Sequence, residues 1–171
     1  MSDNLSRRRY LAGTGAALTI GTLAGCSGGG DGGDGSDGSD GSGGGNAAED
    51  VPDEIDEYLS DARMYEGTIM DFTGQDEVTV EVGAGDVGFA FSPAAIRIDS
   101  STTVVWEWTG NGGAHNVASV EGSESDFDSG DSVSEEGHTF EQSFDNTGIQ
   151  LYQCTPHQAN GMLGAIEVVE A

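Results

Sequence analysis

One stretch near the C-terminus carries most of the information in this chain: Tyr152-Gln153-Cys154-Thr155-Pro156-His157-Gln158-Ala159-Asn160-Gly161-Met162. It places a thiol, an imidazole and a thioether in the order Cys-x2-His-x4-Met. The flanking residues 148–153 and 163–169 are rich in aliphatic and aromatic side chains and predict strands that hold the loop at both ends. Pro156 fixes φ at the start of the turn, and Gly161 allows a positive φ at its end. The loop can therefore direct three side chains at one point.

A second imidazole upstream, His115, completes a set of two imidazoles, a thiolate and a thioether. This His2Cys set with a weak axial Met is typical of blue-copper electron-transfer centres. Structural zinc is the competing interpretation, but zinc takes four strong donors and does not select a thioether. Core packing of Cys154 and Met162 is the other alternative, and it leaves two imidazoles without a role. The pattern favours one mononuclear type 1 copper ion over zinc, an adventitious metal or no metal.

The same residues resemble the plastocyanin type of cupredoxin, and within it the halocyanins, from about Gln75 to the C-terminus. The resemblance is carried by Gly112-Gly113-Ala114-His115-Asn116-Val117 and by the stretch quoted above. It implies four copper ligands: His115, Cys154, His157 and Met162. It also implies that Asn116 hydrogen-bonds toward Thr155 and so ties the two ligand loops together.

Residues 67–171 are expected to form an all-β domain. Val78, Val80 and Val82 alternate with Thr79 and Glu81, and the same period of two recurs at 95–98 and 104–108. Further strands are expected at 116–120 and 139–144. Short strands between Gly, Asp, Asn and Ser clusters predict an antiparallel sandwich, and the resemblance implies the Greek-key cupredoxin form of it. Residues 121–137 are acidic and predict a surface loop anchored by Phe127 and Val133.

Residues 46–66 predict a short helical segment before that domain. Pro52 is followed by four acidic residues in what would be a first helical turn, where the helix dipole favours negative charge. Ile55, Leu59 and Ala62 then repeat at helical spacing on one face. We expect this amphipathic helix to pack on or near the sandwich.

The N-terminal part reads as export and anchoring signals. Residues 1–25 combine an Arg-Arg pair, an uncharged run and a small-residue box before Cys26, which resembles a twin-arginine signal joined to a lipoprotein cleavage site. Cys26 would then carry lipid at the outer face of the cell membrane, which leaves Cys154 for copper and predicts no disulfide. Residues 26–45 are almost entirely Gly, Ser and Asp and predict a disordered, flexible linker.

Charge and the single donor cluster limit the function. The chain has 31 acidic and 5 basic residues, a formal net charge of −26, and this excludes nucleic-acid binding and indicates a halophilic protein. Molar salt screens the self-repulsion of such a chain. No acid-base constellation accompanies the copper ligands, so we expect a monomeric electron carrier between membrane redox complexes and no enzyme. A copper carrier or chaperone outside the cytoplasm is the alternative.

Overall fold

A computed structural model describes residues 44–171. The predicted export signal, Cys26 and residues 26–43 of the predicted linker lie outside this part.

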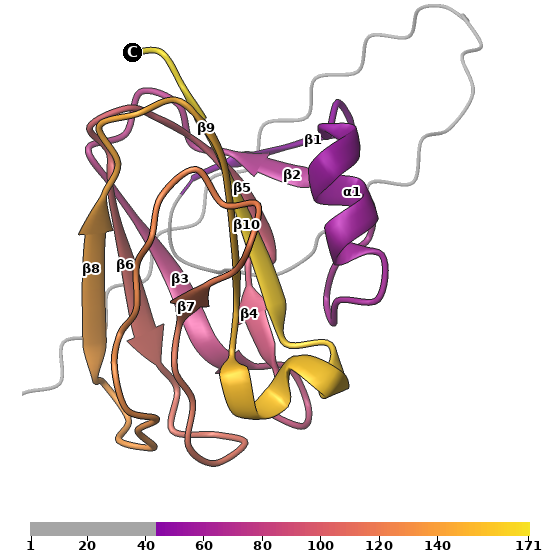
Figure 1. The fold of residues 1–171 in the computed structure, drawn as a ribbon, viewed down its shortest axis with the longest axis vertical. Helices are drawn as coiled ribbons and strands as arrows, with labels where there is room; N and C mark the ends of the chain where they lie inside the picture. Colours follow the sequence, from indigo (N-terminus) through magenta and orange to yellow (C-terminus); the bar gives the residue numbers. More distant parts are fainter. Residues whose placement is uncertain (1–43) are drawn as a thin grey trace, which may run out of the picture. The chain divides into compact units, whose positions relative to one another are not determined.

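The described chain forms two β-sheets that face each other (Figure 1). In sheet order, the six-stranded sheet consists of β1 (Asn46–Ala48), β2 (Ile69–Asp71), β5 (Ala95–Asp99), β10 (Leu163–Val169), β9 (Gly148–Gln153) and β7 (Ala118–Ser119). The four-stranded sheet consists of β4 (Ala90–Ser92), β3 (Glu77–Ala84), β6 (Thr103–Trp108) and β8 (Thr139–Ser143). The predicted all-β sandwich is confirmed.

The predicted antiparallel pairing is wrong for part of the sandwich. β3 pairs parallel with β6, and β5 pairs parallel with both β2 and β10. Successive strands such as β5 and β6 lie in different sheets, so the chain crosses the sandwich and returns to a sheet in the same direction. A period of two reveals which side chains face the core, but it carries no information about the direction of the partner strand.

The core between the sheets is built from the residues that alternate inward. Val78, Val80 and Val82 of β3 are buried, whereas Thr79 and Glu81 between them are more exposed. The ring of Trp106 lies 5.7 Å from that of Phe127 and 5.4 Å from that of Tyr152, measured between ring centroids. Phe127 is one of the two anchors predicted for the acidic loop, and it is confirmed. Cys154 and Met162 belong to this same buried cluster, so the core continues to the ligand loop.

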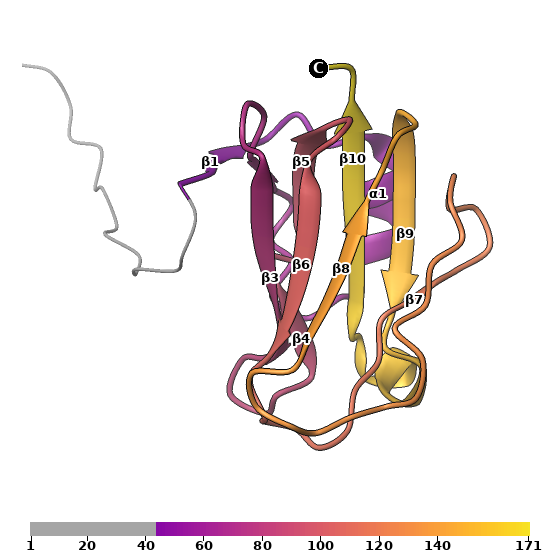
Figure 2. The same ribbon diagram turned by 90° about the vertical axis from the view of Figure 1, so that its left-hand side faces the viewer.

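The predicted helix is present as α1 (Asp53–Leu59), with acidic residues in its first turn. It covers the face of the six-stranded sheet that points away from the four-stranded sheet (Figure 2). Ile55 and Leu59 are fully buried there, in a second apolar cluster with Leu151 and Ala165. Among residues 44–171, no helix has the length and apolar character needed to cross a membrane.

One feature of the region before α1 was not predicted, namely strand β1. The tripeptide Asn46–Ala48 has little strand propensity, but it pairs antiparallel with β2 and extends the sheet. Arg97 of β5 fixes the same region from the other side. Its guanidinium lies 2.6 Å from Glu167 and 3.3 Å from Asp50, measured between nitrogen and carboxylate oxygen. Residues 46–66 are therefore bound to the sandwich by pairing, apolar contact and charge.

Candidate metal centre

The predicted ligand residues meet at one end of the sandwich. His115 lies in the loop that follows β6, Cys154 follows β9 directly, and Met162 precedes β10. Between Cys154 and Met162 the chain forms the short 3-10 helix η1 (Thr155–Asn160), seen in yellow at the bottom of Figure 1. Pro156 lies in the first turn of η1, and Gly161 ends it with φ 80° and ψ 24°. This left-handed conformation at Gly161 is the one that the sequence predicted.

Three donor atoms converge in the space above η1. The Cys154 Sγ lies 3.6 Å from Nδ1 of His115 and 3.4 Å from Nδ1 of His157, and the two Nδ1 atoms are 3.0 Å apart. A point equidistant from the three atoms lies about 1.9 Å from each, close to the bond lengths of about 2.0–2.3 Å that nitrogen and sulfur make to a comparable ion, zinc. The triangle therefore has the size of a coordination plane.

Met162 is fixed beside this triangle through its backbone. The Cys154 N–H donates to the Met162 carbonyl at 3.0 Å, and the Met162 N–H donates to the His157 carbonyl at 3.3 Å. The side chain of Met162 is fully buried, in the same cluster as that of Cys154. A thioether is a soft and weak donor, and Met162 could serve as a fourth residue that holds copper here.

A hydrogen bond sets the tautomer of His115. Its Nε2 lies 2.7 Å from the carbonyl oxygen of Asn111, and a carbonyl can only accept, so Nε2 carries the proton. The lone pair of Nδ1 then faces Cys154 and His157. Burial is the main cause that lowers the pKa of His115, and repulsion by His157 adds to it. The ring is thus held in the neutral form that binds a metal.

The thiol of Cys154 is held in its protonated form in the absence of a cation. Burial raises its pKa, while hydrogen bonds from the backbone N–H groups of Asn116 and His157 oppose that shift in part. A bound cation would displace this proton, because the thiolate is the ligand form of cysteine. The two N–H groups then stabilise the thiolate charge.

The structure places Asn116 against Thr155, as the resemblance implies. The Asn116 Nδ2 donates to Thr155 Oγ1 at 3.1 Å, and the Thr155 N–H donates to Asn116 Oδ1 at 2.8 Å. This pair of bonds links the loop that carries His115 to the loop that carries Cys154. Trp108, at the end of β6, holds the His115 loop from its own side, since its Nε1 donates to the His115 carbonyl at 3.1 Å.

Sequence reasoning missed Phe89, which lies between β3 and β4. Its ring stacks on that of His157 with centroids 4.4 Å apart and an interplanar angle of 23°, and it meets His115 edge-on at 6.4 Å. An isolated Phe in a Gly-rich turn gives no sequence signal for such a contact. Phe89 and His157 are both half-buried, while His115 and Cys154 are buried, so the site reaches solvent at the His157 side.

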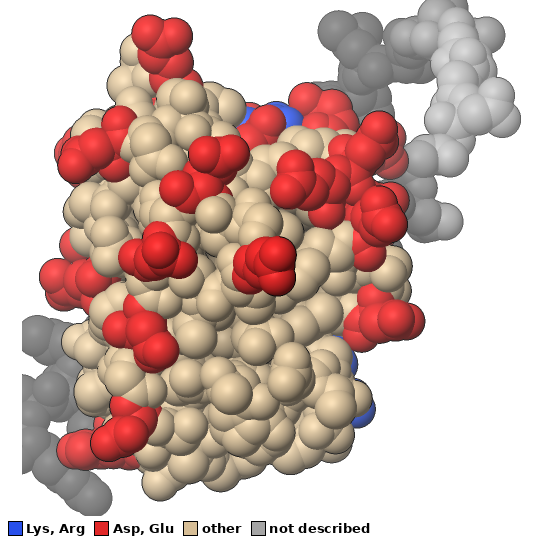
Figure 3. All heavy atoms as spheres, in the orientation of Figure 1, with Lys and Arg blue, Asp and Glu red and all other residues tan. Residues whose placement is uncertain are grey.

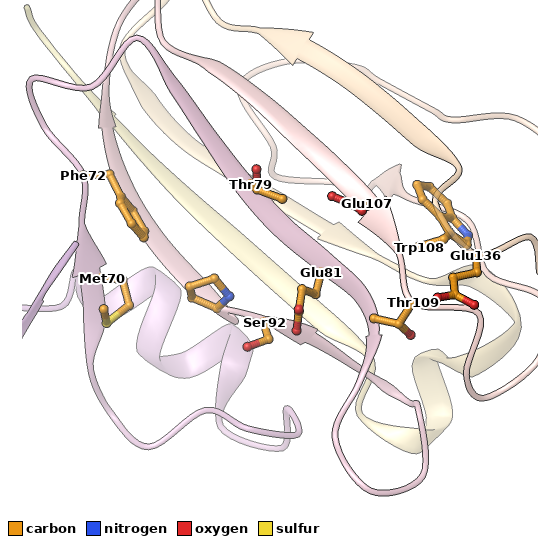
Figure 4. Close-up of a pocket in the computed structure, with 10 residues that line it drawn as sticks. Met70, Phe72, Thr79, Glu81, Ser92, Glu107, Trp108, Thr109 and Glu136 are labelled. Atoms are coloured by element: carbon orange, nitrogen blue, oxygen red, sulfur yellow. The ribbon is translucent and has the colours of Figure 1, made fainter. Parts of the chain in front are cut away.

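The surface over η1 differs from the rest of the face that Figure 3 shows. It shows no acidic side chain in Figure 3, whereas acidic side chains are spread over the body of the sandwich in that view. A cavity of about 400 Å³ lies elsewhere, along β3 and β6, and is lined by acidic and aromatic residues that include Glu81, Glu107 and Trp108 (Figure 4). None of the donor residues lines it. The donor site and this cavity are therefore separate.

Comparison with known proteins agrees with this chemistry. A family model described as copper binding proteins of the plastocyanin/azurin family matches residues 77–169. The halocyanin of Natronomonas pharaonis is 59% identical over 168 residues, which are 96% of this chain and 98% of that protein. The plastocyanin of Scenedesmus fuscus is 32% identical over 99 residues, 54% of this chain and 99% of that protein. The solved structure of oxidised plastocyanin from Dryopteris crassirhizoma is 26% identical, covers 54% of this chain and 100% of that chain, and has a TM-score of 0.46. With this family match over more than half of its residues, the chain belongs to the plastocyanin/azurin family of copper-binding proteins.

Proposed function

We propose that this protein is a one-electron carrier in which His115, Cys154, His157 and Met162 hold a single type 1 copper ion. The observation that carries the proposal is the convergence of one thiol and two imidazole nitrogens, 3.0 to 3.6 Å apart, at the edge of a buried core. When bound, copper supplies the exchange between Cu(I) and Cu(II).

The surrounding residues keep the donors in one arrangement. Asn111 fixes the ring of His115, and backbone hydrogen bonds fix Cys154 and Met162. Donors that these bonds hold in one arrangement move little when charge arrives or leaves, so transfer needs little rearrangement. His157 is the half-buried donor, and it offers the electron a short path to the surface beside Phe89.

Burial favours electron transfer over metal delivery. A copper chaperone has to expose its metal to the receiving protein, and this requires an accessible ligand set. Here His115 is 1% exposed, and Cys154 and Met162 are 0% exposed. These donors protect an ion from exchange and leave no open position for a substrate, which also argues against an enzyme.

We place the carrier on the outer face of the cell membrane, anchored by lipid on Cys26 after twin-arginine export of the folded domain. In this arrangement it would exchange electrons with membrane redox complexes. The support is the sequence pattern of residues 1–26, together with the match to the halocyanin of Natronomonas pharaonis over 96% of the chain. Residues 26–45 would serve as the linker between the anchor and the sandwich.

Visible spectroscopy tests the copper proposal directly. The apo-protein is titrated with Cu(II) in molar salt, and an intense thiolate-to-copper absorption, blue to the eye, should grow to one copper per chain. Reduction should bleach it and reoxidation should restore it. A protein that binds copper and stays colourless would instead support metal delivery.

Met162→Leu is expected to keep the blue colour and to change the reduction potential. The three strong donors remain, and only the weak axial one, which tunes the potential, is lost. Voltammetry of the two proteins measures the difference. Met70→Leu is the matched control, because Met70 lies in β2, away from the ligand loop, and its exchange should leave the potential unchanged. Equal potentials for Met162→Leu and the parent protein would show that Met162 is not the axial ligand.

Cys26→Ser is expected to release the protein from the membrane with its copper spectrum intact. A serine hydroxyl cannot accept the thioether-linked lipid of a lipoprotein, while residue 26 lies far along the chain from the ligand loop. Cell fractionation followed by visible spectroscopy of the soluble fraction measures both properties. Retention of the variant in the membrane fraction would contradict the lipid anchor and point to an uncleaved N-terminal segment.

A further inference from the structure

The segment that follows α1 touches the ligand loop from the outside. Arg63 makes two hydrogen bonds to it. The Arg63 backbone N–H donates to the carbonyl of Gly161 at 2.8 Å, and its side-chain Nε donates to the carbonyl of Asn160 at 2.7 Å. One residue thus satisfies two successive carbonyls at the C-terminal end of η1, where such groups lack partners within the helix. The next residue in the loop is Met162.

The same contact gives a second reason why position 161 requires glycine. A Cβ built at this position would lie 2.5 Å from the carbonyl oxygen of Asp61, which is closer than any side chain tolerates. The backbone at 61–63 therefore lies directly against the backbone of the loop. Residue 161 is therefore restricted to glycine for two reasons, its positive φ and this close approach. The backbone of the loop fits against the backbone of residues 61–63.

The other end of the ligand loop is held by the helix itself. The hydroxyl of Tyr58 donates to the carbonyl of Tyr152 at 3.0 Å, two residues before Cys154. Leu163, the first residue after Met162, packs against the apolar cluster that contains Ile55 and Leu59. Contacts from residues 55–63 thus flank the loop on both sides of its three ligand residues.

We propose that residues 55–63 act as a clamp on the metal loop, and that Arg63 is a positioning residue that fixes the backbone of Met162 relative to Cys154 and His157. The plastocyanin/azurin family model begins at residue 77, so the clamp lies outside the part that defines the family. Only the experiments that measure bound copper depend on the proposed function; the hydrogen-exchange experiment on the apo-protein does not.

The clamp works through geometry rather than through long-range charge. Arg63 is exposed, and at molar salt the Debye length is only about 3 Å, so the field of its guanidinium at the metal site is screened. Hydrogen bonds at 2.7 and 2.8 Å persist under those conditions, because they are direct contacts. The other basic side chain described, Arg97, is bound to Asp50, Asp71 and Glu167 instead.

Amide hydrogen exchange of the apo-protein tests the clamp without copper. Arg63→Ala is expected to speed exchange of the Gly161 and Met162 N–H groups about tenfold, because the loop loses a hydrogen bond from a charged donor and opens more often. Arg63→Lys should restore part of the protection, since its ammonium group can donate to the same carbonyl of Asn160. Glu66→Gln is the matched control in the same exposed segment and should leave both amides unchanged.

In the exchange experiment, two results would overturn the proposal. One is exchange at Gly161 and Met162 that is the same in Arg63→Ala as in the parent protein. The other is an equal acceleration at Val80 and Ile166, which lie in the central core, because this would mean a general loss of stability rather than a loosened loop. Thermal unfolding of each variant, recorded alongside, shows that the comparison is made on folded protein.

The copper-loaded protein gives the second readout. Arg63→Ala should shift the visible spectrum and release copper to a chelator about tenfold faster, in line with the exchange result. A parent protein that never turns blue would remove the proposed function, while the exchange data on the apo-protein would still decide the clamp. A blue parent protein whose spectrum and copper release are unaffected by Arg63→Ala would remove the clamp and leave the proposed function intact.

Discussion

Cys154→Ser is expected to abolish the blue absorption completely. The colour requires charge transfer from a thiolate, and a serine hydroxyl does not ionise at neutral pH. Serine is close to cysteine in volume, and residue 154 keeps its backbone bond to Met162, so the sandwich should still fold. Visible spectroscopy of the copper-titrated variant measures the loss, and far-ultraviolet circular dichroism verifies the fold.

Thr155→Ala is the matched control for that experiment. It removes the hydroxyl that accepts from Asn116 Nδ2 but leaves all four donors in place. The blue band should persist in this variant with a small shift, because only a link between the two ligand loops is weakened. An intense blue band in Cys154→Ser would show that the copper is bound by another sulfur-containing site and would refute the ligand assignment.

Gly112→Ala is expected to lower the free energy of unfolding by about 3 kcal/mol, a large effect for a single methyl group. Gly112 has a φ of 77°, which is unfavourable for alanine, and a Cβ there would overlap the carbonyl of Gly88. The two turns that meet at this contact carry Phe89 and Asn111, both of which touch the imidazole ligands. The variant should therefore also bind copper less tightly.

Gly113→Ala separates the two causes of that loss. Its φ of 95° is also positive, but a Cβ there would meet no atom within 4 Å. The positive φ alone should lower the free energy of unfolding by about 1 kcal/mol in Gly113→Ala. Any further loss measured for Gly112→Ala is then caused by the close approach to Gly88. Equal losses in denaturant unfolding of the two variants would show that the turns can move apart freely.

The ligand loop could be predicted from sequence because its determinants are local. Donors at Cys154, His157 and Met162 lie within nine residues, and the strands predicted at 148–153 and 163–169 match β9 and β10. Turn residues bound these strands on both sides, which fixes their ends as well as their centres. The helix at Asp53–Leu59 was predicted for the same reason, since apolar spacing and an acidic first turn lie in one short segment.

The parts that sequence reasoning missed depend on contacts between distant residues. Strand β1 exists because β2 offers it a free edge, and the parallel pairing of β3 with β6 depends on how the chain crosses the sandwich. Asn111, Phe89 and Arg63 contact the ligand residues or their loop through turns whose conformations no local pattern specifies. Asn, Phe and Arg are ordinary residues in loops and turns. Their role at the ligand loop can be recognised only when their neighbours in the folded chain are known.

The position of β1 sets the point at which a tether would reach the sandwich. The described chain joins the sandwich at β1, toward the end opposite η1, and both views show this separation (Figures 1 and 2). Under the proposed anchoring at Cys26, a sandwich held upright would present His157 away from the lipid. Exchange with a complex in the same membrane then requires the sandwich to turn over. The predicted linker of residues 26–45, with an average span of about 25 Å for a flexible chain, is long enough for that turn.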